Sequence, residues 1–171
     1  LVMARNERID PLSPKGSYAG AMGLGQFMPS SFLKWAVDFD ADGRKDLWEP
    51  ADAIGSVASY FAAHGWQGGQ PVATPAAATG GRAQMLDAGF DTRYSLSTLA
   101  SHDIRPAAQT AQHDDLRLLR LSTYSGDDYW IGYHNFYVIT RYNHSTNYAM
   151  AVHQLAQAVK QRYGTIKVAQ R

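Results

Sequence analysis

Most apolar positions along the chain recur at intervals of three and four residues, which is the period of amphipathic α-helices. This pattern predicts helices over residues 29–36, 50–65, 95–102 and 145–163, and residues 1–10 are predicted to be the end of a further apolar helix. Proline or serine stands at the start of the four complete segments, as is typical of a helix N-terminus.

Shorter segments have the composition of β-strands. Residues 116–121 alternate partly between apolar and polar side chains, residues 129–132 contain Tyr, Trp and Ile, and residues 136–140 could form a strand or the start of a helix. Residues 67–82 are rich in Ala, Gly, Pro and Thr, and we expect an exposed loop or extended connector there. The pattern therefore predicts an α+β protein that is mainly helical, with a small antiparallel β element late in the chain.

An acidic loop lies between the second and third predicted helices. Asp38, Asp40 and Asp42 occupy positions 1, 3 and 5 of the pattern D-x-[DN]-x-[DN]-G-x5-E, and Gly43 follows at the sharp turn. Position 7 would offer the carbonyl oxygen of Arg44. Ca²⁺ prefers about six to eight oxygen ligands, and alternate carboxylates in such a loop point at one centre. The loop is therefore an EF-hand-like candidate for a metal site.

Two carboxylates compete to close this loop. Glu49 occupies the usual final position, and Asp52 offers a second carboxylate just after Pro50. Lys45 stands where ordinary calcium loops place an apolar residue, so a solvated acidic turn is the alternative interpretation. A single loop without a partner loop is expected to be structural, since calcium sensors expose a groove from paired loops. Sodium remains the alternative ion.

Composition narrows the classes of function. The chain has 171 residues, 45% hydrophobic and 18% charged, with a formal net charge of +1, which argues against nucleic-acid binding through bulk charge. Cysteine is absent, so disulfides, thiol catalysis and Cys-zinc sites are excluded. No apolar run approaches the ~20 residues of a transmembrane segment. Aromatic residues reach 12%, with ten Tyr and four Trp, which suits either a core or a sugar-binding surface.

Three separated blocks carry a family resemblance. Residues 20–31, which read GAMGLGQFMPSS, resemble the glycine-rich segment of lytic transglycosylases. Residues 52–66 and 135–145 follow in the same order as in one branch of these enzymes. Together the blocks are similar to the membrane-bound lytic murein transglycosylase B family and its soluble relatives, over nearly the whole chain and most weakly over 67–93.

The resemblance implies a lysozyme-like α+β core that binds peptidoglycan glycan strands. This family cleaves the β-1,4 bond between N-acetylmuramic acid and N-acetylglucosamine with one glutamate, first as acid and then as base. The muramoyl 6-hydroxyl attacks the anomeric carbon and yields a 1,6-anhydro product. An internal nucleophile removes the need for a second carboxylate to activate water.

The catalytic glutamate is the main departure from the family pattern. In this family it precedes the glycine-rich block, in a segment absent from these residues. We therefore expect residues 1–171 to be the C-terminal portion of the catalytic domain, with the EF-hand-like loop 38–52 and a variable excursion at about 67–115. Such a fragment would lack activity alone and expose an apolar face, to be covered by the missing N-terminal part or by self-association. Glu7 is the weak candidate acid on the chain itself.

The resemblance also assigns substrate-binding and metal-binding roles to residues that match the family's positions. Seven residues match positions of the substrate groove: Ser17, Gln26, Phe27, Tyr60, Tyr142, Asn143 and Tyr148. The first two match residues that hydrogen-bond the sugar or the acid, the next two match the cleft wall, and the last three match the C-terminal side of the groove. The Asp38 loop matches a calcium site that some members close at the position of Asp52, which we favour over Glu49.

Two other functions fit the same residues. A calcium-stabilised, non-catalytic carbohydrate-binding module would use the same aromatic and amide groups. A lysozyme-type hydrolase would use Glu7 as its acid and release reducing ends. The family resemblance also implies a periplasmic location, and it leaves open an outer-membrane anchor through a missing N-terminus.

Overall fold

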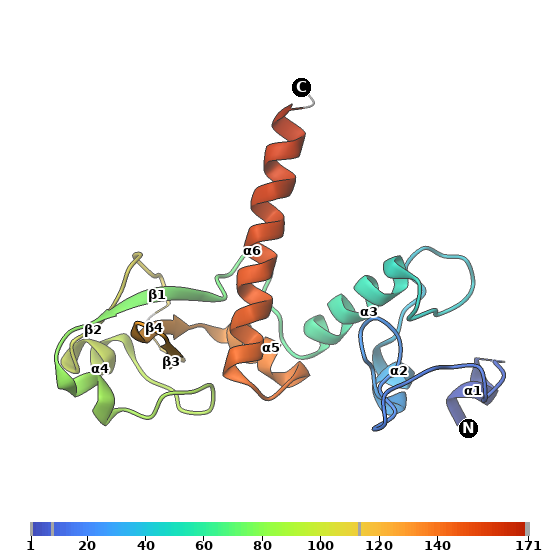
Figure 1. Cartoon of the computed structure of the whole chain (residues 1–171), viewed down its shortest axis with the longest axis horizontal. Helices are drawn as coiled ribbons and strands as arrows, with labels where there is room; N and C mark the ends of the chain where they lie inside the picture. The colour runs from blue at the N-terminus through green and yellow to red at the C-terminus, as the bar shows by residue number, and fades with distance from the viewer. Residues whose placement is uncertain (1, 8, 113, 170–171) are drawn as a thin grey trace. The chain divides into compact units, whose positions relative to one another are not determined.

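The computed structural model describes residues 2–7, 9–112 and 114–169, and it divides into two compact units. The first unit ends at Gly65, and the second begins at Trp66. Figure 1 labels the α-helices and β-strands of both units. Each unit has its own elements and is described separately.

The first unit contains three helices, α1 (Val2–Asn6), α2 (Pro29–Trp35) and α3 (Pro50–Ala63). Both α2 and α3 have proline in their first turn, where the missing N–H costs no helical hydrogen bond. The two helices predicted to begin at these prolines are therefore confirmed. The predicted N-terminal helix is shorter than residues 1–10, since α1 ends at Asn6.

The glycine-rich segment before α2 folds into tight turns. Met22 forms isolated β-bridges with Gly16 and Phe27, and the side chains of Met22 and Phe27 are buried. Gly23 has φ +66°, and a Cβ atom there would lie 2.5 Å from the carbonyl oxygen of Leu47. Only glycine allows this close approach between the glycine-rich segment and the acidic loop.

The second unit is built on a four-stranded antiparallel sheet. Its strands are β1 (Ala73–Ala78), β2 (Ile104–Pro106), β3 (Arg117–Thr123) and β4 (Gly126–Gly132), in the order β2-β1-β4-β3. The strands expected near 116–121 and 129–132 are confirmed as β3 and β4.

The expectation of a loop or connector over residues 67–82 is wrong for β1, which lies in the interior of the sheet. Alanine and proline are weak strand formers, but β1 pairs with both neighbours: Ala76 is opposite Pro106 on one side and Tyr129 on the other. The carbonyl of Pro75 accepts a hydrogen bond from the amide of Ala107 at 2.8 Å. Pairing on both sides therefore overrides the local preference.

The core of the second unit lies under this sheet. Two short helices, η1 (Gly81–Met85) and α4 (Leu96–Ser101), cover it, so the 67–115 region contributes two strands and two helices. Ser95 caps α4 by accepting a hydrogen bond from the amide of Thr98. The buried apolar cluster consists of Ala83, Leu99, Ile104, Leu116, Leu118, Ile131 and Tyr133.

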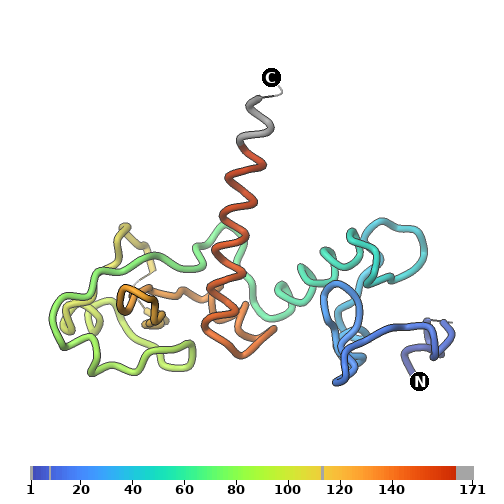
Figure 2. The backbone as a smooth tube through the Cα atoms, in the orientation of Figure 1, coloured from blue at the N-terminus to red at the C-terminus, as the bar shows by residue number. Residues whose placement is uncertain are grey.

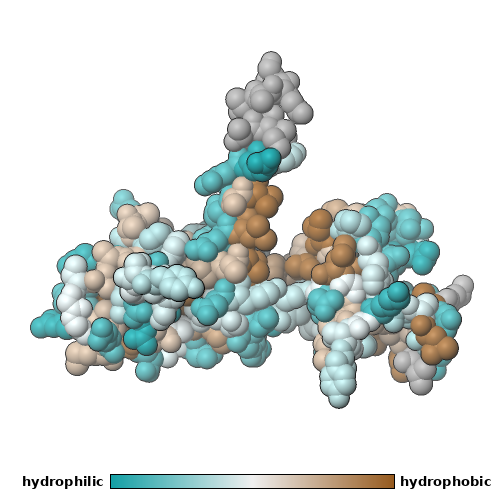
Figure 3. Space-filling model, viewed as in Figure 1, coloured by the Kyte–Doolittle hydropathy of each residue, from teal (hydrophilic) through white to brown (hydrophobic). Residues whose placement is uncertain are grey.

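The last two helices are α5 (His134–Tyr142) and α6 (Thr146–Ala169). The structure places residues 136–140 in α5, which resolves the strand-or-helix alternative in favour of the helix. Along α6, Leu155 and Val159 are 66% and 60% exposed, and Figure 3 shows apolar surface on this helix. Among the described helices, none combines the length and the apolar composition that a membrane-spanning segment needs.

Candidate functional site

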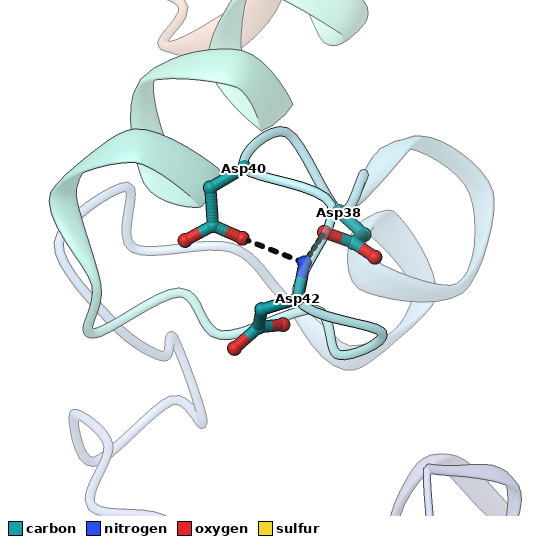
Figure 4. A group of neighbouring side chains, drawn as sticks. All are labelled: Asp38, Asp40 and Asp42. Carbon is teal, nitrogen blue, oxygen red and sulfur yellow. Dashed lines mark hydrogen bonds between the residues drawn. The ribbon is translucent and has the colours of Figure 1, made fainter.

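The acidic loop of the first unit gathers carboxylates around one centre, and Figure 2 traces this loop as a wide turn that leads into α3. Oxygen atoms of Asp38, Asp40 and Asp42 lie within 4.8 Å of one another. Figure 4 shows the Asp42 amide between the other two carboxylates, to each of which it donates a hydrogen bond at 3.1 Å. The Gly43 amide, at a φ of +90°, donates to Asp38 at 2.9 Å. The loop is therefore pre-shaped by its own backbone.

Asp40 also belongs to a second carboxylate group, with Glu49 and Asp52. Asp52 is only 1% exposed, and its two oxygens accept hydrogen bonds from the amides of Phe39 at 2.7 Å and Asp46 at 2.8 Å. Glu49 caps α3 by accepting a hydrogen bond from the amide of Asp52 at 3.0 Å. Both predicted closing residues thus lie beside Asp40, although their own hydrogen bonds differ.

The electrostatics of the loop follow from this crowding. The hydrogen bond from the Asp42 amide lowers the pKa of Asp40, but desolvation and the carboxylates of Asp42, Asp52 and Glu49 together raise it above the ordinary value. Hydrogen bonds from the amides of Asp46 and Phe39 lower the pKa of Asp52. Several ionised oxygens at one centre repel one another, and a hard cation would relieve this repulsion.

Arg44 lies in the same loop, and its amide donates a hydrogen bond to Asp42 at 2.8 Å. This bond continues the series of side-chain-to-amide contacts that begins at Asp38. The carboxylates predicted from the sequence as metal ligands therefore lie close together in the first unit, in the acidic loop and in the first turn of α3.

Four predicted groove residues also belong to the first unit. Phe27 is 2% exposed, and its ring centroid lies 6.1 Å from that of Tyr60. Ser17 is exposed and accepts a hydrogen bond from the Ala21 amide. Gln26 is exposed at a φ of +52°, and its side-chain amide donates to the carbonyl of Gly23 at 2.9 Å. The structure thus pairs the two rings, while the two polar residues also shape the glycine-rich turns.

Tyr60 belongs to a larger aromatic cluster that the sequence analysis did not assign to a site. The ring of Trp35 approaches Tyr60 edge-on at 4.8 Å, and the imidazole of His64 stacks on Tyr60 at 3.9 Å with an interplanar angle of 21°. Tyr60 and His64 are spaced i, i+4 at the end of α3, which is the one sequence signal for this contact. Trp35 comes from α2, so only the packing of α2 against α3 reveals it.

The other three predicted groove residues belong to the second unit. Tyr142 ends α5 and is half-buried, and Asn143 follows in extended conformation at a φ of −143°. The carbonyl of Asn143 accepts a hydrogen bond from the Ser145 amide at 2.7 Å, and Tyr148 lies in the first turn of α6. The structure therefore brings these three residues together at the α5–α6 turn.

The chain contains two glutamates, Glu7 and Glu49. Glu7 follows α1, is half-buried, and its amide donates to the carbonyl of Met3. Glu49 is also half-buried and caps α3. Neither glutamate is fully buried.

The described residues combine helices with a small antiparallel sheet, as expected for a lysozyme-like α+β protein, and comparison with known proteins gives the class. The family described as Transglycosylase SLT domain matches residues 1–157. Membrane-bound lytic murein transglycosylase B of Escherichia coli is 57% identical over 159 residues, which are 93% of this chain and 43% of that protein. The chain belongs to the transglycosylase SLT domain family.

Solved structures agree with this assignment. Lytic transglycosylase Slt35 of Escherichia coli, solved in complex with calcium, has a TM-score of 0.89 and 55% identity, covering 94% of this chain and 51% of that one. Soluble lytic transglycosylase SltB1 of Pseudomonas aeruginosa has a TM-score of 0.87 and 48% identity, covering 95% and 55%. The lysozyme-like fold is therefore confirmed, and the chain spans about half the length of these relatives.

Proposed function

We propose that this chain forms part of a peptidoglycan lytic transglycosylase, which cleaves the N-acetylmuramic acid–N-acetylglucosamine bond and leaves a 1,6-anhydro end. The observation that carries the proposal is the 57% identity to a murein transglycosylase across 93% of the chain. A further relative, SltB3 of Pseudomonas aeruginosa, is 32% identical and was solved in complex with NAG-anhNAM-pentapeptide. That ligand contains the anhydro sugar expected of the reaction.

The catalytic acid is proposed to come from a segment outside these 171 residues. One glutamate would protonate the leaving oxygen and then, as a base, deprotonate the muramoyl 6-hydroxyl as it attacks the anomeric carbon. Glu7 and Glu49 are each only half-buried, whereas the general acid of a glycosidase is typically enclosed in an apolar pocket. The 43% coverage of the relative leaves room for that segment.

The residues of this chain are proposed to bind the glycan. Tyr60 offers ring surface to the C–H faces of the sugars, and the buried ring of Phe27 packs against Tyr60 as part of the cleft wall. Ser17 and Gln26 offer hydroxyl and amide groups for the sugar hydroxyls. Tyr142, Asn143 and Tyr148 of the second unit are also proposed to bind glycan. The exposure of Ser17, Gln26 and Asn143 supports this role.

Calcium is proposed to be a structural ion of the acidic loop. The proposed ligands are Asp38, Asp40, Asp42, the carbonyl of Arg44, and Asp52 in preference to Glu49. The two carboxylate groups that share Asp40 support this assignment, as does the calcium complex of the Escherichia coli relative Slt35. When bound, the ion would neutralise the carboxylates and hold the loop against α3.

Thermal unfolding in CaCl₂ and in NaCl tests the ion. A ligand at 100 times its Kd stabilises the folded state by about 2.7 kcal/mol, so millimolar CaCl₂ should raise the Tm clearly. The double variant Asp38→Ala/Asp42→Ala should lose this shift, while Asp128→Asn on β4 should keep it. An equal response of the wild type to NaCl would favour sodium, and no response to either would reject the metal site.

Purified sacculi test the activity. The 171-residue chain alone is expected to bind sacculi without cleaving them, and a version extended with the upstream segment of the Escherichia coli relative is expected to release anhydro ends, detected by mass spectrometry. Reducing ends that disappear in Glu7→Gln would instead support the hydrolase. Binding without cleavage in both versions would support the non-catalytic module, and no binding would reject the proposal.

The proposed partners and location follow from the same family. Peptidoglycan glycan strands are the proposed partner, together with the remaining part of the transglycosylase, and the periplasm is the proposed location. The Escherichia coli relative is named as membrane-bound, whereas SltB1 is named as soluble. Anchoring to the outer membrane is therefore an open part of the proposal, to be tested by membrane fractionation.

A further inference from the structure

We propose that Trp35 and His64 extend the glycan-contact surface of Tyr60, and that the Nε2 atom of His64 accepts a hydrogen bond from an amino sugar. This inference rests on the proposed function, and it adds two residues to which the sequence assigned no role. We call the three side chains Trp35, Tyr60 and His64 the ring cluster.

The ring cluster is closely packed within the first unit. His64 stacks nearly parallel on Tyr60 at 3.9 Å, and Trp35 contacts both rings at centroid distances of 4.8 Å from Tyr60 and 4.9 Å from His64. All three side chains are half-exposed. A cluster of this kind keeps rigid ring surface at the solvent boundary, where sugar C–H groups can pack on it with little loss of side-chain entropy.

The hydrogen bond at Nδ1 of His64 determines which ring nitrogen can accept a hydrogen bond from a ligand. Nδ1 lies 2.7 Å from the carbonyl oxygen of Tyr60. A carbonyl oxygen can only accept, so Nδ1 carries the hydrogen, and the Nε2 of the neutral ring keeps an acceptor lone pair. Within the described residues, Nε2 makes no hydrogen bond. An N-acetyl N–H or a sugar hydroxyl has the donor that this atom needs.

His102 shows that a histidine can cap a helix without contacting an aromatic ring. His102 ends α4 as His64 ends α3, and its Nδ1 lies 2.9 Å from the carbonyl oxygen of Thr98, four residues earlier. His102 has no aromatic contact among the residues that the structure describes. Helix capping therefore does not require a stacked ring, and the stacking of His64 on Tyr60 and its tilted contact with Trp35 need a separate explanation.

The variants separate these roles. His64→Asn keeps a donor near the position of Nδ1 but removes the ring and Nε2, and His102→Asn makes the same change at the control cap. Trp35→Leu removes a second ring of the cluster, and Trp35→Phe restores an aromatic one. Circular dichroism and thermal unfolding should show similar folds and similar small losses of stability for His64→Asn and His102→Asn.

Binding of tetra-N-acetylchitotetraose and of uncrosslinked murein glycan strands to the 171-residue chain gives the decisive measurement. His64→Asn and Trp35→Leu are expected to weaken binding about 3- to 10-fold, the scale of one aromatic contact, while His102→Asn and Trp35→Phe stay near the wild type. In ¹⁵N spectra of the wild type, the Nε2 resonance of His64 should move when the tetrasaccharide is added.

The results distinguish two kinds of failure. If the wild type binds glycan and the His64 and Trp35 variants bind as tightly, with an unmoved Nε2 resonance, the ring cluster is only structural and this inference is overturned. If the wild type binds neither glycan, the proposed function is rejected, and this inference, which rests on it, is rejected as well. A shift of Nε2 together with weaker binding in both variants supports the ring cluster as a glycan site.

Discussion

Asp52 accepts a hydrogen bond from the backbone amide of Phe39 at 2.7 Å, and this contact joins the first turn of α3 to the start of the acidic loop. The other carboxylate oxygen of Asp52 accepts from the amide of Asp46, near the end of the loop. One buried side chain therefore fixes both ends of the candidate metal loop. This position supports the proposal that Asp52, which lies outside the usual twelve-residue pattern, closes the loop.

The first prediction compares Asp52→Asn with Glu49→Gln. In Asp52→Asn an amide nitrogen replaces one acceptor oxygen, so the bond to Phe39 or Asp46 is lost, and we expect a lower Tm and a weaker response to CaCl₂. Glu49→Gln keeps an oxygen that can cap α3, and we expect a smaller change. Thermal unfolding with and without CaCl₂ checks this, and the reverse order would assign the closing ligand to Glu49.

The second prediction concerns the approach of Gly23 to Leu47. An alanine at residue 23 would have to adopt a φ of +66°, and its Cβ would clash with the Leu47 carbonyl. Gly23→Ala should therefore lower the free energy of unfolding by roughly 3 kcal/mol or more. Gly20→Ala is the matched control, since Gly20 has φ +85° with no atom within 4 Å of the added Cβ. It should cost only about 1–2 kcal/mol. Urea unfolding measures both, and equal losses would contradict the packing argument.

The third prediction concerns Arg117, which is 1% exposed in the second unit. Its guanidinium donates to the carbonyls of Phe90 at 3.0 Å and Asp115 at 2.7 Å, and it lies 4.6 Å from the ring centroid of Tyr137. Arg117→Met leaves these acceptors without their donor and should cost roughly 2–4 kcal/mol in urea unfolding.

Arg120 on the same strand is the control for Arg117. It makes a half-exposed ion pair with Asp127 at 3.9 Å, so Arg120→Met should change stability by about 1 kcal/mol or less. A loss of the same size in both variants would mean that the buried contacts of Arg117 contribute no more than a surface ion pair.

The fourth prediction is a pH dependence from His153, which α6 buries against Trp130 at a ring distance of 6.4 Å. Burial lowers the pKa of His153 below its ordinary value of 6.5. As the pH falls below 6.5, the unfolded chain takes up this proton before the folded chain, so the free energy of unfolding decreases until the pH passes the folded pKa.

His153→Leu should remove this contribution. Urea unfolding at several values between pH 8 and pH 5 measures the slope, and the variant should lose less stability over this range than the wild type. At pH 8 His153 is neutral in both the folded and the unfolded wild type, so the stability difference between wild type and variant at this pH measures the change in packing alone. An unchanged slope in the variant would contradict the argument.

The helices that begin at Pro29 and Pro50 could be predicted because their start signals and apolar spacing are local. β1 could not be, because alanine and proline became a strand only through hydrogen bonds with β2 and β4, which are distant in sequence. For the same reason, residues 136–140 remained ambiguous until their packing was known. Burial of Phe136 and Val138 in α5 decided for the helix.

Asn135 shows the same difference for a single side chain. It belongs to a block that supported the family resemblance, but its role was not readable there. In the structure it is 1% exposed, accepts from the amide of Gln67 and donates to the carbonyls of Gln67 and Gln70. It thereby anchors the start of the second unit to α5, a contact across more than sixty residues.

The sequence by itself determined the family, the acidic loop and the helix starts, since these depend on residue type and short-range spacing. The tertiary structure decided which distant groups meet: Asp52 with Phe39, Trp35 with His64, and β1 with its two neighbours. The physical reason is that buried hydrogen bonds and ring contacts form between segments whose separation along the chain carries no local signal. The acidic loop can be recognised within one segment of sequence, whereas the ring cluster forms only when α2 packs against α3.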